Sequence, residues 1–458
     1  MRITIIGAGP AGLVSGAALQ ERGHDVTIID RDPGPAPDGT WERRGVMQFH
    51  HAHSFRGPVV ETLRQELPDA WQAWLAAGAE PIDMALPDGR VMSMGIRSRR
   101  VTFETALRSA VVRRCDSDFS VSGRGRLRLR VGHVQAVTSS RGRFSGVRVD
   151  DRHYRTDAVI DASGRSGRVA ARRREPALAG GPCGIAYVDR LYRLRDGADP
   201  GPLQGPAAYV GDHDGYLVIL FLHERGYFSV LIVRPTSDRR LVELRHTAAF
   251  EAACRAIPAL AQWTDPARVR PASDVYPGGP LMNWYRSQRG RDGRLALPGL
   301  FFVGDSVCTT TPNFGRGITT TCLQIGELLR LVDVHTVAGS TSFDAEAVGE
   351  TFDAWCLAQM KPWVDDHVHI DTEQARRWDG AAIDLDRRLP ADLIIKAATQ
   401  DPVIGQAMDG FNAMLAGPAS LDVVEPRARE LFRSGWRPAF SEGPSRDELA
   451  EIVTLAAS

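Results

Sequence analysis

The stretch MRITIIGAGPAGLVSGAALQERGHDVTIIDRD, residues 1–32, carries the strongest architectural signal of the chain. Residues 3–6 form a continuous apolar run, which is typical of a buried parallel strand. Gly7, Gly9 and Gly12 complete the pattern G-x-G-x-x-G. These glycines permit a tight turn, close approach of the backbone to a pyrophosphate, and close packing of a helix on a strand. The pattern predicts a dinucleotide-binding βαβ unit whose helix directs its first N–H groups at phosphates.

An acidic residue follows the second predicted strand of this unit. Residues 26–29 are apolar and lead into Asp30, which comes 18 residues after Gly12. A carboxylate at about 20 residues from the glycines hydrogen-bonds a free ribose hydroxyl, so NAD or FAD is favoured over NADP. A glycine-rich turn that only packs would not need an acid there.

Composition limits the function classes. The 458 residues are enough for two or three domains, and 56 basic residues balance 56 acidic ones, so nothing indicates nucleic-acid binding. Six scattered cysteines without a CxxC pair indicate reduced thiols. The longest apolar runs are far shorter than the ~18 residues of a membrane-spanning helix. We expect a cytoplasmic protein with no signal peptide and no integral membrane segment.

The stretch WERRGVMQFHHAH, residues 41–53, follows the second strand. Arg43 and Arg44 lie in a predicted loop that can return to the pyrophosphate and neutralise its charge. The three histidines of this stretch suggest a metal site as an alternative. They lack a further ligand at helical spacing, so we expect polar loop residues or part of a cavity wall, and no metal.

A second junction lies in RTDAVIDASGRSGRVA, residues 155–170. An apolar strand at 158–160 runs into Asp161 and small residues, and Arg165 and Arg168 follow nearby. This pattern predicts a strand-to-helix junction whose backbone approaches a ligand. A plain strand-to-turn exit is the alternative.

A third junction lies in LFFVGDSVCTTTPNFGRGITTT, residues 300–321. A buried strand at 300–303 is closed by Gly304 and Asp305, and Pro312 precedes a glycine-shaped turn. A helix is predicted from Ile318 onward, and a helix N-terminus stabilises negative charge, such as that of a reduced flavin at its N1–C2=O edge. We therefore expect the two glycine loops to bind opposite ends of one extended molecule, the first at the pyrophosphate and the second at the ribityl chain and ring.

The rest of the chain suggests two further regions. Strand-like segments within residues 171–282 predict an antiparallel sheet that forms a substrate-cavity wall, and the residues from about 340 onward are predicted to be helical. Candidate aromatic wall residues are Tyr187, Tyr209, Tyr216, Phe221 and Phe228, about half of which strand alternation should place in the core. The expected divisions are a discontinuous FAD-binding domain (1–65, 97–170 and 283–335), a substrate domain (66–96 and 171–282) and a C-terminal helical region (336–458).

Four elements together resemble the FAD-dependent monooxygenases of the para-hydroxybenzoate hydroxylase type, especially bacterial enzymes that hydroxylate or epoxidise natural-product intermediates. They are the first glycine loop with Asp30, and the stretches RRGVMQFHHAH, DASGRSG and GDSVCTTTPNFGRG. The resemblance implies an α/β fold with a Rossmann-like FAD-binding domain of the GR2 type, an inserted antiparallel-sheet substrate domain and a C-terminal helical region. It implies cofactor contacts from Gly7, Gly9, Pro10, Ala11, Gly12, Asp30, Arg31, Arg44, Arg100, Val134, Asp161, Gly304, Asp305, Pro312, Gly315, Arg316, Gly317 and Ile318.

The resemblance also implies how these contacts are distributed along FAD. Asp30 would bind the adenosine ribose, Arg44 would lie near the pyrophosphate, and Arg100 would lie beside the adenosine. The backbone of Val134 would bind the adenine, and Asp305 would bind the ribityl hydroxyls. Residues 312 and 315–317 would face the isoalloxazine. Met47 stands where the subgroup has proline, and the D-G motif is altered to Asp-Ala-Ser.

The implied activity is that of an oxidoreductase of secondary metabolism, in which reduced FAD and O2 form a C4a-(hydro)peroxide that hydroxylates or epoxidises a small-molecule substrate. Electrons would come from NAD(P)H or a flavin reductase, and no second G-x-G-x-x-G indicates a separate NAD(P)H domain. No catalytic side chain is assigned. The alternatives are an FAD-dependent reductase or dehydrogenase of isoprenoid-like double bonds and a non-catalytic lipid-binding relative. The tryptophan halogenases have a W-x-W-x-I-P motif and an essential lysine. This sequence lacks the motif, and its only lysines, Lys361 and Lys396, lie late in the chain, so halogenation is not expected.

Overall fold

The N-terminal stretch forms the centre of a five-stranded parallel sheet. A computed structural model describes residues 1–86, 89–116, 124–140, 143–167, 174–201, 203 and 208–458. The sheet order is β18-β10-β1-β2-β6, and Ile5 of β1 pairs with Ile160 and Ile28 on its two sides. The strands are β1 (Arg2–Ile6), β2 (Asp25–Asp30), β6 (Leu127–Val131), β10 (Ala158–Asp161) and β18 (Leu300–Phe302). The predicted Rossmann-like α/β core is confirmed.

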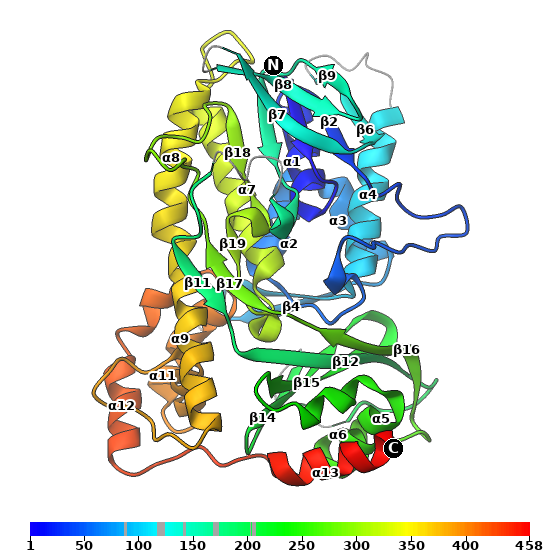
Figure 1. The fold of residues 1–458 in the computed structure, drawn as a ribbon, viewed down its shortest axis with the longest axis vertical. Helices are drawn as coiled ribbons and strands as arrows, with labels where there is room; N and C mark the ends of the chain where they lie inside the picture. Colours follow the sequence, from blue (N-terminus) through cyan, green and yellow to red (C-terminus); the bar gives the residue numbers. More distant parts are fainter. Residues whose placement is uncertain (87–88, 117–123, 141–142, 168–173, 202, 204–207) are drawn as a thin grey trace.

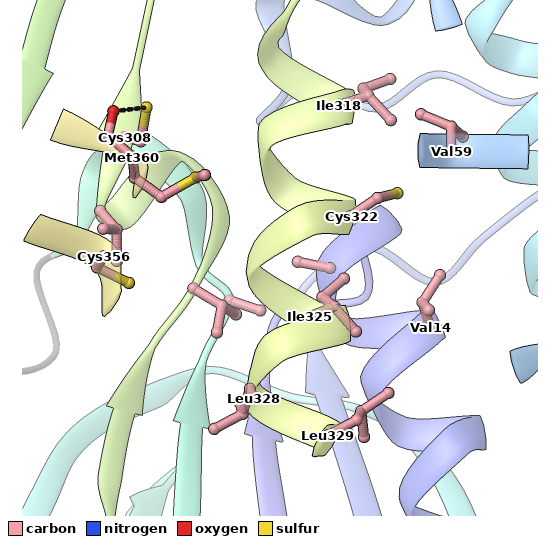
Figure 2. Packing of buried hydrophobic residues seen from close by; sticks show 14 of the residues in the cluster. Val14, Val59, Cys308, Ile318, Cys322, Ile325, Leu328, Leu329, Cys356 and Met360 are labelled. Atoms are coloured by element: carbon pink, nitrogen blue, oxygen red, sulfur yellow. Dashed lines mark hydrogen bonds between the residues drawn. The ribbon is translucent and has the colours of Figure 1, made fainter. Parts of the chain in front are cut away.

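Five helices of the N-terminal and middle parts of the chain contribute buried residues to the core around this sheet. They are α1 (Pro10–Glu21), α2 (Gly57–Glu66), α3 (Pro68–Ala76), α4 (Arg100–Asp116) and α7 (Gly317–Val334). Gly12 of α1 is required for this packing, because a Cβ atom there would lie 1.9 Å from the carbonyl oxygen of Gly7. Figure 2 shows Cys322 and Ile325 of α7 packed toward Val14 of α1 and Val59 of α2. The loop of the third junction, residues 304–317, is called the third loop or third glycine loop below. The apolar helix predicted after it is confirmed.

A second, antiparallel sheet lies below the first in Figure 1, with the order β13-β14-β15-β12-β16. Helices α5 (Thr247–Ala256), α6 (Pro258–Trp263) and α13 (Arg446–Ala457) pack with one face of it. The strands are β12 (Ile185–Leu194), β13 (Ala208–His213), β14 (Tyr216–Leu222), β15 (Tyr227–Pro235) and β16 (Val269–Gly278). The predicted antiparallel sheet is confirmed.

Strand alternation divides the expected aromatic wall between the two faces of this sheet. Tyr209, Tyr216 and Phe228 belong to the core under the helices. Tyr187 and Phe221 belong to a separate cluster on the opposite face, where Met47 and Ala52 of the first domain pack against them. Of the five aromatic residues, Tyr187 and Phe221 therefore lie on the face away from these helices.

Within the described residues, the remaining strands form three small sheets. Residues 66–96, expected with the substrate domain, place α3 in the first core and their strands in a separate sheet of order β3-β5-β4. The strands are β3 (Phe55–Arg56), β4 (Glu80–Ala85), β5 (Val91–Arg97), β7 (Val134–Ser140), β8 (Arg143–Val149), β9 (Arg152–Tyr154), β11 (Ala179–Pro182), β17 (Met282–Tyr285) and β19 (Cys308–Thr309). The short 3-10 helices include Gly164–Ser166, Gly304–Ser306 and Pro312–Phe314.

The C-terminal region is helical and contributes to both cores. Helices α8 (Ala345–Gln359), α9 (Lys361–Trp378), α10 (Ala391–Ala397), α11 (Pro402–Asn412) and α12 (Glu425–Arg433) supply residues to the first core. Helix α13 instead buries Leu449, Ala450 and Val453 in the second core (Figure 1). All six cysteines are free thiols. Within the described chain, none of the helices combines the length and apolar composition that crossing a bilayer requires.

The position of α13 predicts a difference between two leucines of that helix. Leu449 is fully buried in the second core, whereas Leu455 is 76% exposed. We expect Leu449→Ala to lower the free energy of unfolding by about 2–5 kcal/mol, because it leaves a cavity under the sheet. Leu455→Ala should change it by less than about 0.5 kcal/mol. Urea denaturation of the full chain measures both, and equal effects would contradict the docking of α13.

Candidate cofactor site

A cavity of 1560 Å³ lies where the parallel strands end, and both glycine loops line it. This is where open α/β sheets bind ligands. The cavity extends from Asp30 and Val134 at one end to Pro312 and Gly317, and Tyr187 reaches it from the second sheet. Every residue expected to contact the cofactor lines this cavity except Gly12 and Asp161.

Two helix N-termini face the cavity. Gly9 precedes the first residue of α1 and Arg316 precedes that of α7, and neither start has a side-chain cap. The hydroxyls of Thr320 and Thr321, which lie within α7, donate to the carbonyl oxygen of Gly317 and so satisfy none of the N–H groups at the helix start. The free N–H groups of both helices are therefore available to a ligand, and both helix dipoles favour negative charge.

Glycine residues, which have no side chain, leave room for a ligand at both helix starts. A Cβ atom on Gly317 would meet no atom within 4 Å, and one on Gly9 would come no closer than 3.7 Å to Arg43. Gly315 serves a different purpose, since its φ is +63° and a Cβ there would lie 2.5 Å from the Cβ of Ser54. The third loop is thus held directly against the stretch that contains the histidines.

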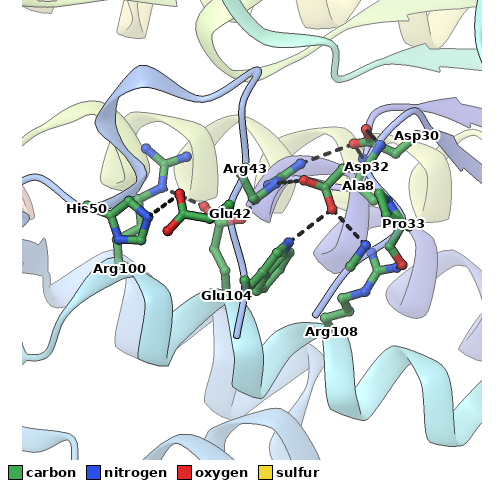
Figure 3. Close-up of polar contacts among 12 residues, drawn as sticks. Ala8, Asp30, Asp32, Pro33, Glu42, Arg43, His50, Arg100, Glu104 and Arg108 are labelled. Atoms are coloured by element: carbon green, nitrogen blue, oxygen red, sulfur yellow. Dashed lines mark hydrogen bonds and ion pairs between the residues drawn. The ribbon is translucent and has the colours of Figure 1, made fainter. Parts of the chain in front are cut away.

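Arg43 is the centre of a buried ion cluster beside the first loop (Figure 3). Its guanidinium contacts Asp30 at 3.2 Å and Asp32 at 3.4 Å, and it donates to Glu104 of α4. Burial opposes the charge of Arg43, but these three carboxylates more than offset it and raise its pKa. Arg44, which we expected at the pyrophosphate, is exposed at the cavity edge.

The Asp30 carboxylate is held by backbone N–H groups of two residues. Oδ2 accepts a hydrogen bond from the backbone N–H of Ala8 at 2.6 Å, and Oδ1 accepts one from the N–H of Asp32 at 2.9 Å. Each carboxylate oxygen can accept two hydrogen bonds, so Oδ1 retains capacity for a ribose hydroxyl. Asp30 therefore fixes the first glycine loop and lines the cavity at the same time.

Arg100 is held by neighbours that set its direction into the cavity. Its Nε donates to Glu104 at 2.5 Å, and its Nη1 lies 3.2 Å from Nε2 of His53. Burial, together with the charge of Arg100, keeps the pKa of His53 well below its usual value. His53 is therefore neutral, and its Nδ1 donates to the carbonyl oxygen of His51 at 2.9 Å.

Two carboxyls near the third loop, the half-buried Asp305 and the buried Asp161, differ in their surroundings. Asp305 lines the cavity, and burial raises its pKa, with Arg100 and Arg165 opposing that shift. Such a carboxyl suits a hydroxyl-rich ligand. Asp161 is fully buried and outside the cavity lining, and its Oδ1 accepts from the N–H and the hydroxyl of Ser163, which does line the cavity. Arg168 lies outside the described residues.

The three histidines have three separate partners. His50 pairs with Glu42 at 3.0 Å, His51 pairs with Asp189 at 2.6 Å, and His53 faces Arg100. No group of three or more potential ligand side chains that could hold a metal ion occurs in the described part of the chain. His51 and Ala52, which donates its N–H to Asp189 at 2.9 Å, fasten this stretch to β12 of the second sheet.

Several lining residues were not foreseen from the sequence. Met282 and Trp284 of β17 line the cavity, as does Gln48. Alternation in the stretch MNWY could have suggested the first two. The motif R-x-G-V begins at Arg43 and not at Arg44. This spacing could have indicated from the sequence that Arg43 is the arginine of the buried cluster.

One family comparison bears directly on this site. Residues 2–108 match the family model "FAD dependent oxidoreductase". The match covers the first glycine loop, the Arg43 cluster and Arg100. It supports the coarse assignment of the protein as an FAD-dependent oxidoreductase.

The sequence relatives include one long match and several short ones. Protein Rv3254 of Mycobacterium tuberculosis is 25% identical over 444 residues, which are 88% of this chain and 87% of the relative. A D-amino acid dehydrogenase of Rhizobium johnstonii is 30% identical over 90 residues, 17% of this chain, and that match spans 22% of the dehydrogenase.

Solved structures with a similar fold include flavin-dependent enzymes. The flavin-dependent brominase Bmp2 has a TM-score of 0.63 at 14% identity, covering 95% of this chain and 100% of its own. PqsL of Pseudomonas aeruginosa, described as a probable FAD-dependent monooxygenase, has a TM-score of 0.57 at 14% identity, covering 83% of this chain and 98% of its own. The myxobacterial halogenase CndH has a TM-score of 0.55 at 15% identity, with coverages of 100% and 96%. At these identities the likeness concerns the fold.

The residues present fit FAD. An extended cavity with an uncapped helix start at each loop suits a molecule with a central pyrophosphate and a ring that becomes negatively charged on reduction. Gly9 and Gly317 leave the space that close backbone contact requires. Asp30 and Asp305 lie at separate places along the cavity, as two sets of hydroxyls would require.

Filling the space at the start of α7 should block the cofactor. We expect Gly317→Leu to weaken FAD binding at least about tenfold, or about 1.4 kcal/mol, because the side chain enters the cavity. A Cβ atom on Gly326 of the same helix would also meet no atom within 4 Å, but Gly326 does not line the cavity. Gly326→Leu is therefore the matched control. Titration with FAD, followed by flavin fluorescence, measures both, and equal affinities would contradict the site.

The two adjacent arginines should separate stability from binding. Arg43→Met leaves Glu104, Asp30 and Asp32 without their shared cation, so we expect a loss of about 3–5 kcal/mol in unfolding free energy. Arg44→Met should leave stability within about 0.5 kcal/mol and weaken FAD binding about tenfold. Urea denaturation without FAD and FAD titration distinguish the two. An unchanged affinity in Arg44→Met would remove that residue from the cofactor contacts.

Proposed function

We propose that the protein is a flavin-dependent monooxygenase that inserts one atom of O2 into a small natural-product intermediate, by hydroxylation or epoxidation. The observation that carries this proposal is the apolar wall on the cavity side of the second sheet. Tyr187, Leu281, Met47 and Ala52 form this wall where it lines the cavity, and Ile219, Phe221 and Val233 belong to the buried apolar cluster that they pack against. An apolar wall suits an apolar substrate and keeps water away from the reacting atoms.

The wall is continuous with the end of the cavity assigned to the ring. Leu281 belongs to the apolar cluster and also lines the cavity, as does Tyr187. Substrate held against these residues would therefore lie near Pro312 and Gly317. Reduced FAD, when bound, would supply two electrons to O2, so that one oxygen atom of O2 enters the substrate and the other leaves as water.

The chain's own groups would do three things in this reaction. The start of α7 stabilises negative charge at the ring edge, and Asp305 orients the ribityl chain. The apolar wall orients the substrate and excludes water. The electrons would come from NAD(P)H or from a flavin reductase, and the resemblance to enzymes of the para-hydroxybenzoate hydroxylase type supports this subgroup.

Dehydrogenation is the second candidate, in the form of an FAD-dependent reductase or dehydrogenase. The local sequence match to a D-amino acid dehydrogenase favours it. That match covers only 17% of the chain, whereas the PqsL fold covers 83%. The description of PqsL as a probable monooxygenase therefore supports oxygen insertion. Because a brominase and a halogenase have the same fold, the experiment below also tests the reaction with added halide.

Isotope incorporation separates the candidates. We expect the FAD-loaded protein, reduced by NADH, NADPH or dithionite and exposed to 18O2 with a panel of apolar alkenes and phenols, to yield products that carry one 18O atom. Mass spectrometry measures the label. Products that lose two hydrogens or gain them without label would favour the dehydrogenase or reductase. Products that form only with added bromide or chloride would contradict oxygen insertion.

A further inference from the structure

A buried polar cluster lies directly behind the third glycine loop. Asp371 of α9 is 2% exposed, and its Oδ2 accepts from Nδ2 of Asn283 at 2.6 Å. Oδ1 of Asn283 accepts from the backbone N–H of Thr311 at 2.7 Å. The Thr311 hydroxyl lies 2.8 Å from Nδ1 of His367 and donates to Oδ1 of Asp371 at 3.5 Å.

This cluster lies across strand β17 from the cofactor cavity, and its Thr311 is the chain neighbour of a residue that lines the cavity. Met282 and Trp284 of β17 line the cavity, so Asn283 between them points to the opposite face of the strand. Thr311 is followed directly by Pro312, which lines the cavity. Asp371 thus holds, through Asn283, the backbone that presents the loop to the cofactor.

Asp371 also borders a second cavity, of 390 Å³, on the far side of β17. The glycine-rich strand β11 and the last turns of α9 line that cavity, and Arg376 and Asp379 at its edge are exposed. The second cavity gives Asp371 a route for proton exchange with solvent that does not pass through the cofactor site.

The charged and titratable groups around Asp371 come from every element packed against it. Asp366 and His367 lie on its own helix, Arg316 on the loop, Asp392 on α10 and Cys183 before β12. Of these, Arg316 and Asp366 form a buried ion pair at 2.8 Å.

Of this cluster, Asp371 is the group that changes charge near neutrality. Burial raises the pKa of Asp371 to about 7, the bonds from Asn283 and Thr311 oppose that shift, and Asp392 and Asp366 add to it. Burial keeps the pKa of His367 well below its usual value, so His367 is neutral, and burial raises the pKa of Cys183 to about 12.

We propose that Asp371 is a positioning residue that couples its own protonation, through Asn283 and Thr311, to the reduction of a flavin held by residues 312–317. This inference rests on the proposed function only in requiring that FAD binds at that loop. It requires no particular substrate and applies equally to a monooxygenase and a dehydrogenase.

The direction of the coupling follows from charge and hydrogen-bond direction. Ionised Asp371 accepts the Thr311 hydroxyl and places a negative charge behind the loop, which opposes the negative charge of the reduced ring. Protonated Asp371 can instead donate to Thr311, whose hydroxyl then donates to Nδ1 of His367. Reduction of the flavin takes up protons, so its midpoint potential falls as the pH rises. Ionisation of Asp371 above neutrality should lower this potential further.

The test is the flavin midpoint potential of the FAD-loaded full-length protein, measured from about pH 5.5 to 8.5. We expect the potential of the natural chain to fall more steeply around pH 7, and Asp371→Asn to lose this extra slope. Asp365→Asn is the matched control, because Asp365 is a half-exposed carboxylate of the same helix paired with Lys361 at 2.6 Å. Thr311→Val removes a hydrogen bond to the ionised form, so the steep region should move to higher pH.

Each outcome of this measurement decides for or against the coupling. A steep region that survives in Asp371→Asn, or one that is absent from a natural chain that binds FAD, overturns the coupling and leaves the proposed function intact. Full-length protein that binds no FAD overturns the proposed function together with this inference. If Asp371→Asn does not fold, Thr311→Val is decisive, and an unmoved steep region overturns the coupling.

Discussion

Two helix N-termini open onto one cavity without side-chain caps, and the rest of the site depends on them. Unsatisfied N–H groups at a helix start need partners, and a buried start without them is costly. Here α1 and α7 begin at the cavity and have no cap of their own. The parallel sheet places them at the same edge, because β1 precedes the first helix and β18 leads into the loop before the second. A dinucleotide with a negatively charged centre and a reducible ring meets both requirements at once.

Buried charges hold this arrangement from outside the cavity. The Arg43 cluster joins the strand end at Asp30 to Glu104 of α4, and Arg316 of the third loop pairs with Asp366 of α9. The C-terminal region is thereby part of the site's support, since α9 stands behind the third loop while α13 completes the core of the second sheet (Figure 1). Removing one partner from a buried pair costs more than the pair itself contributes, so such contacts are effective at fixing position.

Local pattern predicted the elements of the fold well, whereas side-chain direction depended on residues far away in the chain. The strands around Asp30, Asp161 and Asp305 and the apolar helix after residue 317 follow from periodicity and glycine spacing. Which of two adjacent arginines is buried is decided by Glu104, 61 residues after Arg43. Alternation predicted that the aromatic residues of the second sheet would divide between two faces. The helix-covered face is fixed partly by α13, more than 200 residues after Tyr216, and the buried Asp161 lies outside the cavity lining, where it accepts two hydrogen bonds from Ser163.

The most direct test of the shared flavin site is an experimental structure of the full chain with FAD. We predict the pyrophosphate at the start of α1, between Gly9 and Pro10, and the isoalloxazine against residues 312–317 at the start of α7. We also predict the ribityl chain beside Asp305. A purified protein that stays colourless with excess FAD, or a structure in which the ring lies away from the third loop, would contradict the claim that the two helix starts share one flavin.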